Sequence, residues 1–174
     1  MKNIFNKMVL AVMAAALVFA AFPSTRAFAA DDPALAPTGE QVNLKLEKAW
    51  ARQLVIYENL GRLFNDSEAK IEKIQSLLDK AADNGRDIAD AQSALDAFEA
   101  ALKATKPIYE SMKHIVASHP GFDAKGRVTD AEKARITLKE MDAKLKEVKA
   151  SLDGTGKALR AELLSLRKSG RSSD

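Results

Sequence analysis

Two histidines and two carboxylates lie close together in the middle of the sequence and could bind a metal ion. His114 and His119 are five residues apart, Glu110 lies four residues before His114, and Asp123 lies four residues after His119. Two imidazoles and a carboxylate would suit zinc, and Glu110 and His114 would share one face of a helix. Surface histidines near a helix end are commoner than metal ligands, so we expect no metal or other cofactor.

The segment from Gly121 to Glu132 can be compared with a calcium-binding loop. Gly126 and Glu132 match the sixth and twelfth positions of such a loop. Gly121 and Lys125 stand at the first and fifth positions, where oxygen ligands are needed, so Asp123 and Glu132 alone supply carboxylates at ligand positions. A glycine-containing turn that leads into a capped helix explains the same residues.

The sequence lacks the residue patterns that are typical of enzymes. It has no glycine-flanked serine, no phosphate-binding glycine loop and no cysteine. The acidic residues lie mostly at outward heptad positions beside Lys and Arg, where solvated ion pairs are the rule. We therefore expect a protein that is not an enzyme and has no small-molecule substrate.

Three stretches of apolar residues at heptad spacing must position all of these groups. Their alternating steps of three and four predict helices over about residues 41–84, 87–118 and 129–168. Short connections between helices of similar length favour antiparallel neighbours. The sequence predicts an all-α fold, an elongated antiparallel three-helix bundle or coiled coil over residues 41–168.

Stop and cap residues mark the ends of the expected helices. Gly85 suits the left-handed position just after the first helix. Asp87 is a natural N-cap for the second helix. Thr129 and Glu132 have the spacing of a capping box, in which each side chain bonds a backbone N–H of the other residue, at the start of the third helix.

The regions on either side of the bundle have a different composition. Residues 30–40 contain Pro33, Pro37 and Gly39 and show no apolar period, so we expect a flexible leader there. Residues 169–174 are polar, and we expect them to form a disordered tail. The chain is therefore expected to hold one helical domain.

A break in the first helix would give a four-helix alternative. Asn65, Asp66, Ser67 and Glu68 form a second capping-box pattern, which would end one helix and begin another near Asn65. The heptad spacing keeps its register through this stretch, which favours a single continuous or kinked helix.

A polar layer is expected halfway along the bundle. Folding the second helix back on the first places Asn65 opposite the turn that contains Pro107, and proline kinks a helix because it lacks an N–H. Ser67 and Thr105 occupy seam positions at the same level. We favour matched kinks, with each hydroxyl bonded to a carbonyl one turn earlier. A hinge or a small ligand pocket is the alternative.

The last part of the third helix combines two glycines with a basic face. Gly154 and Gly156 each cost a helix about 1 kcal/mol relative to alanine, and leucines recur on one face after them. We favour packing of this face against the other helices over a detachable arm that binds anionic lipid or an acidic partner. The basic residues of such an arm would be Lys157, Arg160, Arg167 and Lys168.

Residues 1–29 have the pattern of a secretion signal. Basic residues precede an apolar run, Met8 to Phe22, and Ala27-Phe28-Ala29 fits the small-x-small rule of signal peptidase. The run is short for a permanent membrane helix, which favours cleavage before Ala30 over a retained anchor. A lipoprotein anchor needs a cysteine, and the chain has none.

Removing the signal changes the charge of the chain. The formal charge of the whole sequence is +3, and residues 1–29 hold three basic and no acidic residues, so the remainder has 24 of each. Within that remainder, residues 30–124 carry −5 and residues 125–174 carry +5. A neutral chain gives no reason to expect a nucleic-acid partner. The two parts should attract each other within or between molecules.

With these features in view, the chain resembles an uncharacterised family of small secreted bacterial helical proteins. The run His-Pro-Gly-Phe-Asp-Ala-Lys-Gly-Arg-Val-Thr-Asp at residues 119–130 is the most specific part, and the resemblance covers roughly residues 43–168. It implies no activity, cofactor or catalytic residue. The chain is also similar, more weakly, to periplasmic helical chaperones of the Skp and Spy types, although it lacks the paired Leu-Thr-x-x-Gln motifs of the Spy type.

The sequence thus predicts an exported helical protein, periplasmic or extracellular, that acts by protein–protein interaction. An envelope scaffold or binding module, working with a protein partner or with further copies of itself, is the first hypothesis. A chaperone-like or stress-related client-binding protein is the second, and a metal sensor using the histidines is the third. The C-terminal helix could also contact a membrane surface.

Overall fold

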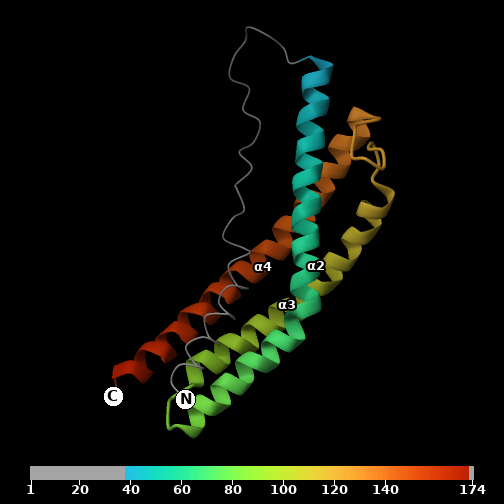
Figure 1. Ribbon diagram of the computed structural model, residues 1–174. Helices are drawn as coiled ribbons and strands as arrows, with labels where there is room; N and C mark the ends of the chain where they lie inside the picture. Colours follow the sequence, from blue (N-terminus) through green and yellow to red (C-terminus); the bar gives the residue numbers. More distant parts are fainter. Residues whose placement is uncertain (1–37, 173–174) are drawn as a thin grey trace.

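The structure, a computed structural model, describes residues 38–172, which contain three helices joined by two loops. Helix α2 covers Gly39–Asp83, α3 covers Ala89–Ser118 and α4 covers Ala131–Ser172. They form an elongated antiparallel bundle (Figure 1). The predicted all-α three-helix fold is confirmed. The expected signal and residues 30–37 of the expected leader lie outside the described residues.

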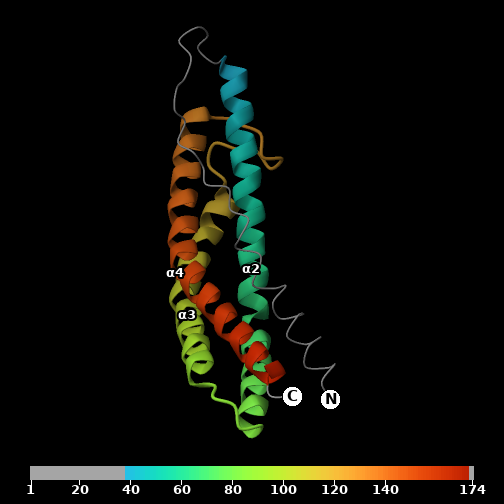
Figure 2. The same cartoon turned by 90° about the vertical axis from the view of Figure 1, so that its left-hand side faces the viewer.

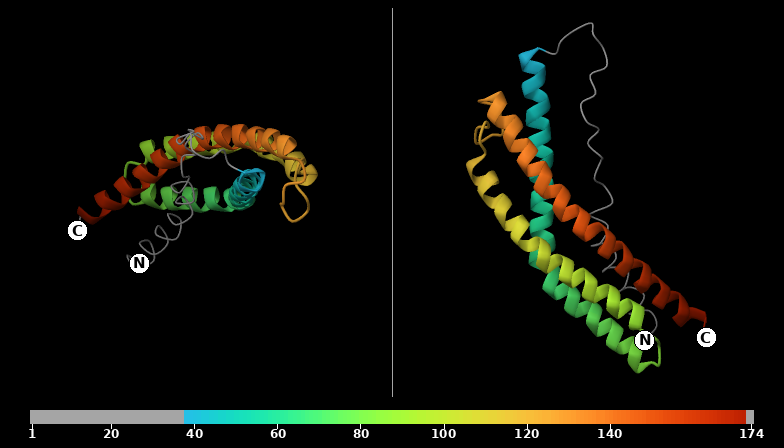
Figure 3. Two further views of the ribbon diagram at one scale, coloured as in Figure 1. Left: turned by 90° about the horizontal axis from the view of Figure 1, so that it is seen from above. Right: turned by 180° about the vertical axis from the view of Figure 1, so that it is seen from behind.

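Helices α3 and α4 form a curved layer, and α2 packs on one face of it. Helix α4 packs mainly on α3 and runs beside it (Figure 2). Seen from above, α2 lies to one side of the α3 and α4 layer (Figure 3, left). None of the helices between residues 38 and 172 is both long enough and apolar enough to cross a membrane.

Helix α2 begins two residues earlier than the sequence predicts. The Thr38 hydroxyl accepts the Gln41 N–H at 3.4 Å, and the Gln41 side-chain oxygen accepts the Thr38 N–H at 3.2 Å. This reciprocal capping box satisfies two N–H groups that would otherwise lack a partner in the first turn. Residues 39–40 therefore belong to the helix and not to a flexible leader.

The caps of α3 and α4 are each displaced from the predicted positions. Asp87 accepts the Ala89 N–H at 3.0 Å, but Ile88 occupies the N-cap position. The predicted capping box of Thr129 is wrong, because Asp130 caps α4 and accepts the N–H groups of Glu132 and Lys133 at 3.1 Å each. The Lys133 N–H lowers the pKa of Asp130, so this carboxylate is charged at the positive end of the helix dipole.

The predicted disordered tail is corrected for residues 169–172, because α4 continues to Ser172, while residues 173–174 lie outside the described residues. Near that end the Ser169 hydroxyl donates to the Leu166 carbonyl at 3.0 Å, and the Arg86 guanidinium donates to the same carbonyl at 3.3 Å. Arg86 follows Gly85, which takes the left-handed conformation predicted for it, with φ at 72°. The turn after α2 therefore supports the last part of α4.

The four-helix alternative is wrong, because α2 runs through Asn65 without a break. Both α2 and α3 bend near their middles, where Figures 1 and 3 show each helix changing direction. Ser67 donates to the Phe64 carbonyl at 2.8 Å, and Thr105, 1% exposed, donates to the Ala101 carbonyl at 2.7 Å. Bonds of this kind bend helices and satisfy buried hydroxyls. These bonds support matched kinks, and the hinge stays a prediction.

Reciprocal side-chain contacts fix the antiparallel register of α2 and α3. The amides of Gln75 and Gln92 donate to each other at 2.9 Å in both directions. Further along the pair, Tyr109 of α3 lies against Gly61 of α2. Both contacts agree with the fold-back at Gly85 that the sequence predicts.

Candidate interaction groove

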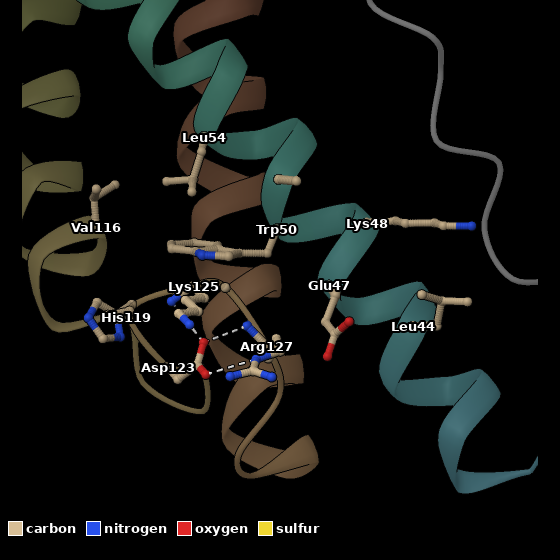
Figure 4. A pocket seen from close by; sticks show the side chains of 13 residues that line it. Leu44, Glu47, Lys48, Trp50, Leu54, Val116, His119, Asp123, Lys125 and Arg127 are labelled. Carbon is tan, nitrogen blue, oxygen red and sulfur yellow. Dashed lines mark hydrogen bonds and ion pairs between the residues drawn. The ribbon is translucent and has the colours of Figure 1, made fainter.

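An open groove lies at one end of the bundle, between the first half of α2 and the loop that joins α3 to α4 (Figure 4). Its volume is about 550 Å³. Helix α2 contributes one wall, the end of α3 contributes Val116, and the loop contributes the other wall. The lining residues used below are Leu44, Glu47, Lys48, Trp50, Ala51, Asp123, Lys125 and Arg127.

Glycine and a buried aromatic pair determine the shape of the loop wall. Gly121 has φ at 85°, and a Cβ on it would lie 2.7 Å from the Asp130 carbonyl oxygen and collide with the backbone of Ala134. Phe122, next in sequence, is 4% exposed and stacks on Trp50 with ring centroids 5.0 Å apart. Only glycine fits this close approach, and it carries Phe122 into the core against α2.

The two carboxylates that line the groove accept hydrogen bonds from N–H groups of the loop. Asp123 accepts the backbone N–H groups of Lys125 and Arg127 at 2.8 Å each, and it accepts the Arg127 Nε–H at 3.2 Å. The backbone bond from Arg127 is the largest cause of the lowered pKa of Asp123, so the carboxylate is charged. Glu47 accepts the Val128 N–H at 3.0 Å and so ties the loop to α2.

Three hydrogen-bond donors of the groove have no acceptor in the described part of the chain. The Trp50 side chain is 3% exposed, and its indole N–H makes no hydrogen bond within residues 38–172. Figure 4 shows the indole nitrogen on the side of the ring that faces the loop. Lys48 and Lys125 lie on α2 and on the loop, and neither pairs with a carboxylate of the described residues.

The groove continues onto an exposed stripe of α2 that faces away from the core. Leu44 is 50% exposed and Val55 is 56% exposed, and the exposed Ala51 lies between them on the same side of the helix. Lys48 projects beside Leu44 in Figure 4. We call Leu44, Lys48, Ala51 and Val55 the open face of α2. Exposed apolar side chains that adjoin a groove are typical of binding surfaces.

The four predicted metal-ligand candidates are not brought together. Glu110 forms an ion pair with Lys113 at 2.5 Å, and Asp123 is part of the loop turn. His114 is exposed, while the Nδ1 of half-buried His119 lies 2.9 Å from the Phe122 carbonyl. Within residues 38–172 no three His, Asp or Glu side chains are grouped closely enough to hold a metal ion.

The residues predicted for a detachable basic arm lie on a packed helix. Leu159 is 5% exposed in a cluster with Ile74 and Leu95 of the other two helices. Lys157 pairs with Asp153 at 3.5 Å. Arg160 and Arg167 are half-buried and Lys168 is exposed, all within the continuous α4. The structure supports the packing interpretation and places this basic helix on the acidic half of the chain.

The predicted glycine kink sites also lie inside α4. Gly154 has no neighbouring atom within 4 Å of the place where its Cβ would be, and the corresponding place at Gly156 lies 3.6 Å from the Phe98 ring. Helix α4 continues through both positions. A side chain fits at each of them, so neither glycine is required by close packing.

The sequence did not point to the groove or to the open face. A detectable signal existed, because Leu44, Ala51 and Val55 repeat at spacings of seven and four, on a stripe offset from the heptad seam. That offset indicates a second apolar side of one helix. The contribution of the loop has no such local signal, since it depends on contacts between residues far apart in the sequence.

Comparisons of the chain with models of protein families, with curated proteins and with solved structures gave no match. The class that the observations define is an all-α three-helix bundle with an open groove at one end.

Proposed function

We propose that this protein binds another protein through the groove and the open face of α2. The observation that carries the proposal is the exposed apolar stripe of Leu44, Ala51 and Val55 beside the groove. Residues seven and four apart lie on one side of a helix, so a second helix can pack along them. Burying this stripe would remove apolar surface from water, which favours association.

The rigid frame of the groove supports recognition of a defined partner. Trp50 stacks on Phe122, Glu47 bonds Val128, and Asp123 closes the loop on itself. A surface that is already ordered loses little conformational entropy on binding. We therefore favour a binding module or scaffold over a carrier of many unfolded clients.

The setting of this function is the cell envelope or the exterior, as the secretion pattern of residues 1–29 suggests. Mass spectrometry of the protein recovered from fractionated cells tests this part. A periplasmic or secreted chain that begins at Ala30 would support export. A full-length chain confined to the cytoplasm would contradict it.

Site-specific photo-crosslinking tests the binding surface. A crosslinker at exposed Ala51 should capture one defined protein, and a crosslinker at exposed Ala143 on α4 should not. Unlabelled protein should compete for the capture, whereas unlabelled Ala51→Glu protein should not. Ala51 is exposed, so the glutamate should leave the fold intact. Equal capture from both positions, or no capture from Ala51, would refute the proposed surface.

Client binding of the chaperone type is the second candidate. Exposed Ile136 on α4, 62% exposed, adds an apolar side chain to those of α2. A chaperone should suppress the aggregation of an unfolded test protein at near-stoichiometric amounts, and the changes Leu44→Ser and Val55→Ser should weaken that effect. A scaffold should have no effect in the same assay.

A further inference from the structure

We infer that the partner presents an acidic amphipathic helix to the groove and the open face of α2. This inference rests on the proposed function and specifies the chemistry of the partner. Three features of the surface support it: the hydrogen bonds of the carboxylates that line the groove, the basic residues along α2 and the Trp50 indole N–H, which faces the groove.

The two carboxylates that line the groove already accept hydrogen bonds from the loop. Asp123 receives three N–H bonds, two from the backbone and one from the Arg127 side chain. Glu47 receives the Val128 N–H. The oxygens of both carboxylates therefore face N–H donors of the loop, which reduces their repulsion of an approaching acidic group.

The basic groups beside the apolar stripe have no such partners. Lys45, Lys48 and Arg52 are exposed and lie three and four positions apart, so they form a basic row next to Leu44 and Ala51. Lys125 adds a positive charge from the loop wall. None of these four forms an ion pair with another residue between 38 and 172. Such a row complements a helix with acidic residues beside its apolar side.

The Trp50 indole adds a specific acceptor requirement. The Trp50 side chain is 3% exposed, and its N–H, which has no acceptor within residues 38–172, stays accessible to solvent on the side that faces the groove. A ligand that covers the groove removes water from this donor, and a covered donor without an acceptor is costly, so a ligand that supplies an oxygen there is favoured. A carboxylate oxygen would satisfy the indole and lie close to Lys125.

The helical spacing of the surface favours a helix over other acidic ligands. The apolar stripe and the basic row run in parallel along the first half of α2. This half of the helix is straight (Figure 1). A partner helix with leucines on one side and glutamates along its edge would match both rows at once. An anionic lipid surface would match the charges but not the regular helical spacing of the two rows.

Trp50 is the only tryptophan in the chain, so its fluorescence reports occupation of the groove directly. The test uses the chain from residue 30 and two synthetic helical peptides. One carries leucines at heptad spacing flanked by glutamates, and its matched copy has glutamine in place of every glutamate. The acidic peptide should shift the Trp50 emission and bind about tenfold more tightly at low salt, an advantage that added salt should reduce.

Charge-reversal variants test which lysines bind the acidic peptide. The double change Lys48→Glu and Lys125→Glu should weaken the acidic peptide about tenfold or more and leave the glutamine copy unchanged. Lys139→Glu, an exposed site on α4 outside the groove, should change neither affinity. Equal binding of the two peptides, or binding of neither, overturns the acidic partner. Capture from Ala51 would still support the proposed function in that case.

Other occupants give different results in the same assay. Docking of the chain's own Asp31 and Asp32 would make the variant Asp31→Asn with Asp32→Asn bind the peptide more tightly. Docking of a second copy would make the Trp50 emission depend on protein concentration. A stronger response to anionic vesicles than to the peptide would indicate a membrane surface. Each of these outcomes overturns the inferred partner.

Discussion

The phenol oxygen of Tyr109 lies where a side chain on Gly61 would begin. A Cβ on Gly61 would be 2.5 Å from that oxygen and 3.4 Å from Cζ of the same ring. Tyr109 is confined because it stacks on Tyr57 at 4.9 Å and packs against Phe64 at 5.0 Å. The buried Gly61 therefore allows α2 and α3 to approach closely in the region where both helices bend.

The change Gly61→Ala should lower the free energy of unfolding by about 1–3 kcal/mol, the usual cost of overpacking. Alanine is favoured in helices by about 1 kcal/mol, so the same change should stabilise the protein once Tyr109→Phe has removed the hydroxyl. Urea unfolding of the two single variants and the double variant measures this coupling. An equal effect of Gly61→Ala in both backgrounds would contradict the close contact.

Tyr57 should make the stability fall at high pH. The pKa of Tyr57 is raised mainly because its side chain is buried, and next because of a hydrogen bond with the Tyr109 hydroxyl. The folded protein keeps this proton above about pH 10, where an unfolded tyrosine loses it. The free energy of unfolding should therefore decrease as the pH rises beyond that value.

Thermal unfolding between about pH 9 and about pH 11 measures this dependence. Tyr57→Phe should show a smaller fall in Tm than the unchanged protein over that range. An identical fall in both proteins would assign the effect to other groups, such as the lysines.

Replacing two of the glycines by alanine should change the stability of the protein in opposite directions. Gly121→Ala should cost about 3 kcal/mol or more, because its φ is 85° and its Cβ would meet the backbone of Ala134. Gly154→Ala should raise stability by about 1 kcal/mol, since it is helical and has open space around it. Circular dichroism during thermal unfolding compares the two. A stable Gly121→Ala variant would disprove the tight loop.

Replacing a buried and an exposed leucine by alanine tests which of the two side chains contributes to the stability of the bundle. Leu159→Ala should lower the free energy of unfolding by about 2–4 kcal/mol, because Leu159 is 5% exposed between the other helices. Leu44→Ala should change it by less than about 0.5 kcal/mol, because Leu44 is 50% exposed. Urea unfolding supplies both values. A small effect at Leu159 would restore the detachable arm.

Gln53 is a polar residue at a seam position, and replacing it should raise stability. Its Nε2 donates to the Leu138 carbonyl at 3.0 Å, while its buried Oε1 has no partner within residues 38–172. Gln53→Leu loses one bond of about 1 kcal/mol but removes an unsatisfied buried oxygen that costs about 1–3 kcal/mol. We expect a higher Tm by calorimetry. A lower Tm would contradict the prediction that removing the unsatisfied Oε1 outweighs the loss of the hydrogen bond.

Much of the fold was predictable because its determinants are local in sequence. Heptad spacing gave the three helices, and Gly85 gave the fold-back that opposes Asn65 to the turn containing Pro107. The cap of α4 was misplaced by one residue because Thr129 and Asp130 are both good caps, and two N–H bonds to Asp130 decided between them. Such neighbouring alternatives differ by little free energy.

The candidate site was not predictable in the same way. The sequence by itself determined that α2 carries Leu44, Ala51 and Val55 on a stripe outside its seam. The tertiary structure alone decided that this stripe stays exposed, that Phe122 stacks on Trp50, and that the Asp123 carboxylate accepts hydrogen bonds within its own loop. The physical reason is that helix formation depends on neighbours in sequence, whereas exposure and charge compensation depend on which distant groups the completed packing brings together.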